Sequence, residues 1–319
     1  MSSAVTPDLD TKFMVDPYLN WVKAEAVLIH EGAALDLLTL DVKPWARFGM
    51  KGAVCHVEGR CDFLTAFLFA LEAGQSSAPV RHTYEEVFYV LSGSGETIVT
   101  LSDGHELTLE WGEKKLFAVP INATARHMAG PKGARFVALN NFRYLMGLYR
   151  NEAFLFGNSS PLHGRQKRAL DAGLLADPVM AAASTDELTP LELADLSLGV
   201  DLTMLSPKTS TLARRQFQGR HILGVDGQGF TLSFSNKSSE IRRIDWRHGM
   251  LVGCKNMQFH QHFNSGGAPA RFIGVELGSP SSPMFRSRRT VYGDTSVYAS
   301  GAATIPRTEE RPEIRTALG

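Results

Sequence analysis

The chain alternates short apolar segments with polar turns over most of its length, a pattern that predicts β-strands. Turn-forming stretches such as Ser92–Gly95 and Ser102–Gly104 separate these segments. Between residues 36 and 150 the expected strands are Phe63–Leu71, Val87–Leu91, Glu96–Leu101, Glu106–Trp111, Lys115–Val119 and Arg135–Leu139. Strands of this length and spacing are typical of an antiparallel barrel or sandwich rather than of alternating strands and helices.

The same rhythm returns between residues 201 and 280. The expected strands there are Thr211–Arg215, Arg220–Val225, Phe230–Phe234, Ile241–Trp246, Met250–Gly253 and Arg271–Glu276. The sequence therefore predicts an all-β fold in five parts: an N-terminal helical lead (1–35), a first barrel (36–150), a partly helical linker (151–200), a second barrel (201–280) and a polar C-terminal arm (281–319).

The two strand-rich halves are similar to each other at a constant spacing. Glu110-Trp111 begins a segment that ends at His127, and Asp245-Trp246 begins one that ends at His262, 135 residues further along. The same spacing relates Glu86 to His221. Weak identity at one fixed offset indicates a duplicated barrel.

Composition narrows the class of protein. The 319 residues carry 33 Lys and Arg against 33 Asp and Glu, so no overall field attracts nucleic acid or an anionic membrane. Three cysteines are too few for a disulfide framework, and no apolar run approaches the roughly 18 residues of a membrane helix. The N-terminus lacks the features of a signal peptide. We expect a cytoplasmic protein with a small-molecule ligand and no nucleic-acid or membrane partner.

Titratable side chains recur in the first half at a definite spacing. His82 is followed after three residues by Glu86 and after six more by Gly93. Because side chains alternate along a strand, Glu86 is expected to face the barrel interior and Glu85 the solvent. About 45 residues beyond His82, a segment that includes Pro120 ends in His127.

These residues resemble the two sequence motifs of the cupin superfamily. Val80 stands where the first motif has its first histidine, and Ala125 stands at the strict ligand position of the second motif. Because residues two apart on a strand face the same way, His127 can still point into the barrel.

The second half resembles the same motifs less closely. Its second motif appears in the spacing of Gly249, His260 and Asn264. In its first motif the two histidine positions hold Arg214 and Gln216, and the glutamate position holds His221. The resemblance covers roughly residues 60–145 and 200–278 and is to two-barrel cupins, or bicupins, which include gentisate-type dioxygenases. It implies two tandem jelly-roll-like barrels and a homodimer or higher homo-oligomer.

The resemblance also implies a metal site. His82, Glu86 and His127 would hold one divalent ion, with Fe(II) expected and Mn(II), Zn(II) or Ni(II) as alternatives. A second and less favoured set consists of Gln216, His221, His260 and His262. Arg214 at a ligand position would repel a metal and could instead anchor a substrate carboxylate. Tyr89 and Phe117 are candidates to line a substrate pocket.

The sequence leaves three functions open. The leading hypothesis is a metal-dependent, dioxygenase-type enzyme that acts on a small chelating molecule such as a phenolic acid, an enol or a diketone. The alternative is a non-redox metal-dependent hydrolase, lyase or isomerase with the same fold. The third is a metal-free binding protein, in which His127 and Glu86 only form hydrogen bonds inside a polar barrel.

Overall fold

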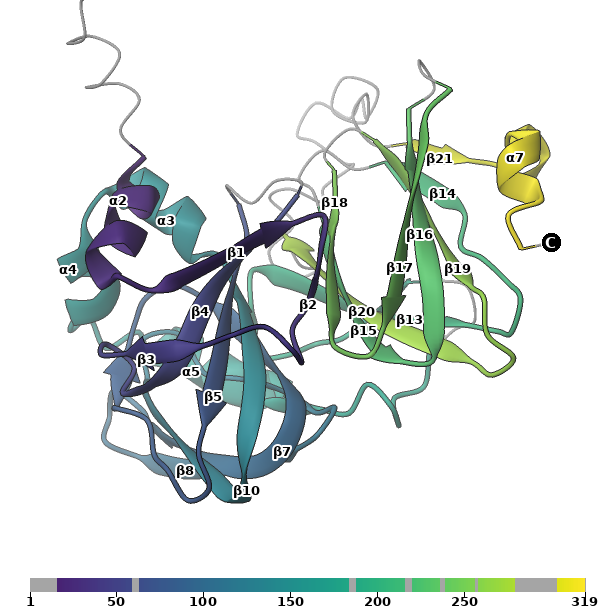
Figure 1. The fold of residues 1–319 in the computed structure, drawn as a ribbon. Helices are drawn as coiled ribbons and strands as arrows, with labels where there is room; N and C mark the ends of the chain where they lie inside the picture. The colour runs from purple at the N-terminus through teal and green to yellow at the C-terminus, as the bar shows by residue number, and fades with distance from the viewer. Residues whose placement is uncertain are drawn as a thin grey trace, which may run out of the picture.

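Two β-rich units lie side by side in the structure and are joined by a partly helical segment (Figure 1). The structure is a computed structural model, and it describes residues 16–58, 63–183, 188–215, 220–235, 239–255, 258–278 and 303–318. The expected all-β class with two barrels is confirmed. In these ranges no helix is long and apolar enough to cross a bilayer.

Helices are short and few in the described ranges. They are α2 (Pro17–Glu25), α3 (Phe142–Tyr149), α4 (Glu152–Gly157), α5 (His163–Ala172), α7 (Pro312–Arg315) and the 3₁₀ turn η2 (Arg307–Glu309). Asp16 caps α2 by accepting hydrogen bonds from the backbone N–H groups of Tyr18 and Leu19, and Pro17 occupies the first turn, where no N–H is needed. The helix thus begins where its sequence specifies.

The first barrel is formed by one long, curled sheet. Its strands are β1 (Leu28–Gly32), β3 (Lys43–Trp45), β4 (Met50–Val57), β5 (Thr65–Leu71), β6 (Val80–Arg81), β7 (Glu86–Thr100), β8 (Glu106–Gly112), β9 (Leu116–Ala118), β10 (Thr124–Asn140) and β11 (Leu175–Ala176). They pair in the order β1-β4-β5-β10-β7-β9-β11, with β3 on β4, β6 on β10 and β8 on β7.

The turn predicted at Ser92–Gly95 is not a turn. These residues lie inside β7, which runs without a break from Glu86 to Thr100. Gly93 has φ +81°, and a Cβ at this position would lie 2.1 Å from the carbonyl oxygen of Gly133 on β10. The register with β10 shifts in this region, so the glycine-rich stretch bends the strand around the barrel instead of reversing the chain.

The second barrel is formed by two sheets. One has the order β12-β13-β20-β15-β18-β2 and the other the order β17-β16-β19-β14-β21. Their strands are β2 (Ala34–Asp36), β12 (Leu188–Pro190), β13 (Leu198–Leu205), β14 (Ala213–Arg215), β15 (Arg220–Asp226), β16 (Gln228–Phe234), β17 (Ile241–Arg247), β18 (Met250–Cys254), β19 (Phe259–Asn264), β20 (Ala270–Leu277) and β21 (Ala303–Ile305).

The described part of the C-terminal segment packs on its own barrel. β21 pairs with β14, and α7 follows at the outer end of the second barrel (Figure 1). Ile314 is buried with Phe234 and Phe259. Glu310 accepts a hydrogen bond from Gln261, whose side chain points out of the barrel. The segment therefore covers the outer face of the second barrel.

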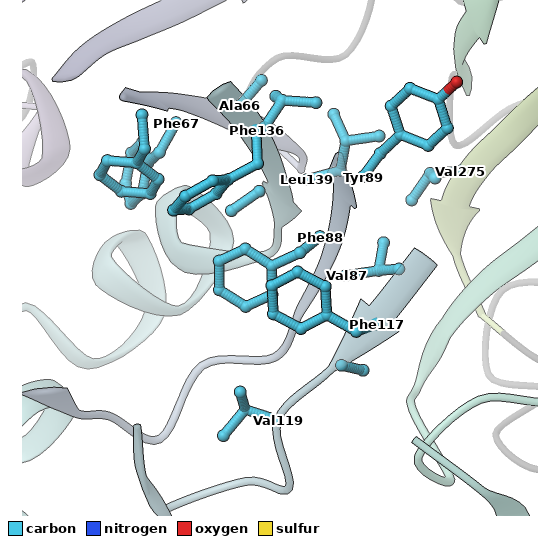
Figure 2. Close-up of a cluster of buried hydrophobic side chains, with 14 of the residues drawn as sticks. Ala66, Phe67, Val87, Phe88, Tyr89, Phe117, Val119, Phe136, Leu139 and Val275 are labelled. Carbon is cyan, nitrogen blue, oxygen red and sulfur yellow. The ribbon is translucent and has the colours of Figure 1, made fainter. Parts of the chain in front are cut away.

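The N-terminal strands tie the two barrels together. β1 runs parallel to β4 of the first barrel, and β2, one residue further on, pairs with β18 of the second. The largest apolar cluster also crosses the boundary, since it includes Leu223 and Val275 of the second barrel together with the core of the first. Figure 2 shows Val275 beside Tyr89 at the edge of that core.

A tryptophan packed against a glycine marks the equivalent corner of each barrel. A Cβ added to Gly95 would lie 2.4 Å from Cη2 of Trp111, and one added to Gly229 would lie 2.4 Å from Cζ2 of Trp246. The duplication seen in the sequence is thus repeated in the packing, because each indole ring lies close to a glycine at a position where a side chain would not fit.

Replacement of Gly95 by Ala should overpack this corner and lower the free energy of unfolding by about 1–3 kcal/mol. Gly112→Ala is the matched control, because no atom lies within 4 Å of a Cβ added there. Urea unfolding of the two variants measures the difference. Equal stability of the two variants would contradict the packing described.

Candidate functional site

The two histidines and the glutamate singled out in the first half line one cavity. His82 follows β6, Glu86 begins β7, and His127 lies on β10. Ala125 lines the same cavity as His127, as expected for residues two apart on a strand. The remaining wall is mostly apolar and includes Phe69.

His82 and Glu86 are in direct contact inside the barrel. Nε2 of His82 lies 2.7 Å from Oε1 of Glu86, and both side chains are buried. Nδ1 of His82 lies 2.8 Å from the backbone carbonyl oxygen of Tyr84, whose ring stacks on the imidazole at 3.7 Å. The carbonyl can only accept, so Nδ1 carries a proton and Nε2 is the ring nitrogen that faces the carboxylate.

His127 is oriented by a hydroxyl group behind it. Its Nδ1 lies 2.8 Å from Oγ1 of Thr97, and that hydroxyl accepts a hydrogen bond from the indole N–H of Trp111 at 2.9 Å. Nδ1 is thus occupied by this contact, and Nε2 is the ring nitrogen left to face the cavity. Burial lowers the pKa of His127 to about 3, and the charge of His82 acts in the same direction. The ring is neutral at physiological pH, the form that binds metals.

These three side chains are of the types that bind metal ions, but they are not yet gathered around a single point. In the described ranges no three His, Cys, Asp or Glu side chains are already grouped closely enough to hold an ion. His82 and Glu86 bond to each other, and His127 faces the cavity that they line. The types of donor fit a divalent ion, and an ion would take the place of the proton between His82 and Glu86.

The second barrel has a cavity at the equivalent place, with a different lining. Arg214, Arg220, His260 and His262 line it together with Cys254, and it encloses about 30 Å³. His262 corresponds to His127, since its Nδ1 lies 2.9 Å from Oγ1 of Thr231, as that of His127 does from Thr97.

The strand register corrects one predicted ligand. On β20, Gly274 pairs with Ile222, and the equivalent strand β10 of the first barrel pairs Ala138 with Phe88. Phe88 and Ile222 therefore occupy equivalent positions, and they are 134 residues apart. At the same offset Glu86 corresponds to Arg220, and His221 is one position off.

His221 accordingly points away from the cavity. It lies on the face of β15 that carries Leu223 and Val225, and these two pack in the core shared with the first barrel. Burial lowers the pKa of His221 to about 4. Gln216, the other predicted ligand of this barrel, lies outside the described residues.

Arg220 forms a buried ion pair inside the second barrel. Its guanidinium group donates two hydrogen bonds to Asp201 on β13, and its Nη1 lies 3.7 Å from Oε2 of Glu276. Burial alone would lower the pKa of Arg220, but the charge and hydrogen bonds of Asp201 raise it. The side chain crosses β20 at Gly274, where a Cβ would lie 1.7 Å from Nη2.

The two predicted pocket aromatics have packing roles in the structure. Phe117 stacks between Phe88 and Trp111 at interplanar angles of 5°, and Figure 2 shows Phe88 and Phe117 face to face. Tyr89 is buried at the junction of the barrels, where its hydroxyl lies 3.2 Å from Nδ1 of His248. Arg214, the third predicted substrate residue, does line a cavity.

Glu85 was expected to be a solvated charge, and that prediction is wrong. Its side chain is buried and accepts hydrogen bonds from Arg165 of α5 at 2.6 Å and from the backbone N–H of Ser197 at 2.8 Å. The linker covers the outer face of β7, so both faces of the strand are buried at this point. Glu85 holds the linker against the first barrel.

Sequence reasoning missed Asp201, Thr97 and Thr231. The threonines could have been found from the repeat, because they are 134 residues apart, as are the residues of β7 and β15. Asp201 could not have been found in this way. It pairs with Gly274 on β20, and the residue at the matching place in the first barrel is the apolar Phe67, which pairs with Ala138 on β10.

Two tandem β-barrels of this topology form a bicupin-like fold. Solved structures with this fold are similar to the chain. Oxalate decarboxylase of Lactobacillus farciminis in complex with formate has a TM-score of 0.55 at 10% identity, over 77% of this chain and 86% of that one. A mutant of Bacillus subtilis oxalate decarboxylase has a TM-score of 0.54 at 13% identity, over 78% of each chain.

The structure of the Bacillus subtilis enzyme at pH 4.6 has a TM-score of 0.52 at 12% identity, over 78% of this chain and 77% of that one. No family model matches the sequence, and no curated protein matches it. At such identities the similarity establishes the fold, and the resemblance to gentisate-type enzymes is not confirmed.

Replacement of Arg220 by Met should lower the free energy of unfolding by about 3–5 kcal/mol, because Asp201 and Glu276 would remain buried without their cation. Urea unfolding measures the loss, and adding Asp201→Asn to Arg220→Met should restore part of it. A variant as stable as the wild type would contradict the assignment of a buried ion pair.

His221 should make folding sensitive to acid. Its pKa in the folded protein is about 4, below the ordinary value of 6.5, so the unfolded chain binds more protons between these pH values. Its contribution is present above about pH 6.5 and is lost as the pH falls toward 4. At about pH 5 the unfolding free energy of His221→Leu should change with pH less steeply than that of the wild type, by up to about 1.4 kcal/mol per pH unit. Equal slopes in urea titrations would contradict this.

Proposed function

We propose that the protein is a bicupin enzyme that depends on a divalent metal held in the first barrel by His82, Glu86 and His127. The observation that carries this proposal is the burial of two imidazoles and one carboxylate around one cavity. Two histidines and a carboxylate leave coordination positions open for a substrate. The similar solved structures reported above are oxalate decarboxylases by name, and this favours the non-redox alternative over the oxygenase.

A bound divalent ion would polarise a chelating oxygen of the substrate. The chain's own part is orientation: the carbonyl of Tyr84 fixes the ring of His82, and Thr97 fixes that of His127. Phe69 and Phe88 line the cavity and exclude water. Apart from its histidines, the described lining of this cavity has no basic side chain, so a substrate carboxylate would have to bind through the ion.

The reaction that we propose is non-redox bond cleavage, such as decarboxylation, of a small organic acid that chelates the ion through two oxygens. A substrate of this kind brings negative charge to the ion and needs no further cation in the cavity. Cytoplasmic location and a homo-oligomeric state remain predictions from the sequence.

A second candidate is the Fe(II)-dependent dioxygenase expected from the sequence. The donor set of two histidines and one carboxylate favours it, since such sets serve oxygen-using iron enzymes. Oxygen-electrode measurements during turnover separate the two candidates. Consumption of one O₂ per turnover would support the dioxygenase, and turnover without O₂ consumption would support the non-redox enzyme.

Protein loaded separately with Mn(II), Fe(II), Zn(II) or Ni(II) and then desalted should retain about one ion per chain of the metal that the site prefers. His82→Ala should lose this metal, because it removes the ligand that contacts Glu86. His260→Ala, in the second barrel, should retain it, and His105→Ala is the control for an exposed histidine. Elemental analysis measures the content. Loss in His260→Ala with retention in His82→Ala would place the metal in the other barrel.

A further inference from the structure

The walls of the first-barrel cavity are apolar, apart from the three proposed metal ligands and one serine. In the described ranges, the apolar side chains that complete the lining are those of Phe48, Met50, Phe69, Ala78, Val80, Phe88 and Ala125. None of these side chains can donate a hydrogen bond to a carboxylate. The part of a ligand that meets these walls is therefore expected to be apolar.

The side-chain donors of this cavity are already in use. Oγ of Ser77 donates to the carbonyl oxygen of Ala78 at 2.9 Å and accepts from the backbone N–H of His127 at 2.9 Å. Nδ1 of His82 donates to the carbonyl oxygen of Tyr84. The two histidines keep only their Nε2 atoms for the cavity, and these are the atoms that would hold the ion. A substrate oxygen that is not bound to the ion would thus find no free side-chain donor in the described lining.

The space between the proposed ligands is small. It measures about 10 Å³, about the room that one water molecule needs, so an ion would nearly fill it. Among the described lining residues, Ala78 and Val80 are partly exposed and the others are buried. The substrate is therefore compact, and it reaches the ion past these two side chains.

Val80 lies between the two imidazoles. It pairs with Ala125 across β6 and β10, and His82 and His127 each come two residues further along the chain from one member of this pair. Because the strands are antiparallel, the two histidines lie on opposite sides of the pair, and all four side chains line the cavity. Arg81, the next residue after Val80, is not among the lining residues, as expected for a side chain on the other face of β6.

We infer that the substrate of the first barrel carries one carboxylate, bound through the ion, and ends in an apolar group that lies against Val80. This inference rests on the metal site proposed above. A second carboxylate would lose water without meeting a donor, whereas an apolar group of the same size loses nothing. The site should therefore reject small dicarboxylates, oxalate included, although the similar solved structures are oxalate decarboxylases by name.

The test is isothermal titration calorimetry at about pH 7, with protein loaded with the ion that it retains in the experiment above. The probes are lactate and tartronate. Both can chelate an ion through a hydroxyl group and a carboxylate, and they differ only in that the methyl group of lactate is a second carboxylate in tartronate. Lactate should bind about tenfold more tightly. The ion alone would favour the opposite order, because tartronate brings it more negative charge.

Val80→Thr keeps the size of the side chain and adds a hydroxyl donor beside the ion. It should bring the affinity for tartronate to within about threefold of that for lactate. Val80→Ala is the matched control, because it gives space without a donor and should keep the preference for lactate. Elemental analysis and far-UV circular dichroism check the ion content and fold of each variant. If Val80→Thr does not retain the ion, the preferences of the wild type and of Val80→Ala decide.

Equal affinity for the two probes, or tighter binding of tartronate, would overturn this inference and leave the metal site standing. The absence of binding by either probe to ion-loaded protein would overturn it as well. A wild-type protein that retains no ion would overturn both proposals, because the substrate would then have nothing to chelate.

Discussion

A charged group inside a narrow barrel must have a partner, and one inward position in each barrel determines which partner that is. In the first barrel this position is Glu86, paired with His82; in the second it is Arg220, paired with Asp201. Removing a charge from water costs several kcal/mol unless an opposite charge or a hydrogen bond replaces the lost solvation. The residue at this position therefore determines which buried partner each barrel must supply.

The rest of the fold keeps the two cavities apart and rigid. The strands β1 and β2 connect the barrels, and the shared apolar core fills the space between them, so neither barrel can turn freely against the other. Within each barrel a threonine fixes the inward histidine. Duplication of one scaffold followed by exchange of a few inward residues explains how two similar barrels came to have different sites.

Much of this arrangement follows from the sequence, and the failures have definite physical causes. The resemblance of His82, Glu86 and His127 to the cupin motifs located the first cavity, and strand alternation correctly turned His127 inward, because it depends only on local geometry. Arg220 was missed because the repeat offset is 134 at β15 but 135 between His127 and His262, and a slip of one residue exchanges the two faces of a strand. Glu85 was placed in solvent because its partners, Arg165 and Ser197, come from a linker whose position depends on tertiary packing.

The central proposal is that a divalent metal binds in the first barrel, where the inward residue is Glu86, and not in the second, where it is Arg220. Anomalous diffraction from crystals soaked in Mn(II) tests it directly. We expect a single strong peak inside a barrel, between His82, Glu86 and His127. A Mn(II) peak beside Arg220 and His260, with none near Glu86, would contradict it.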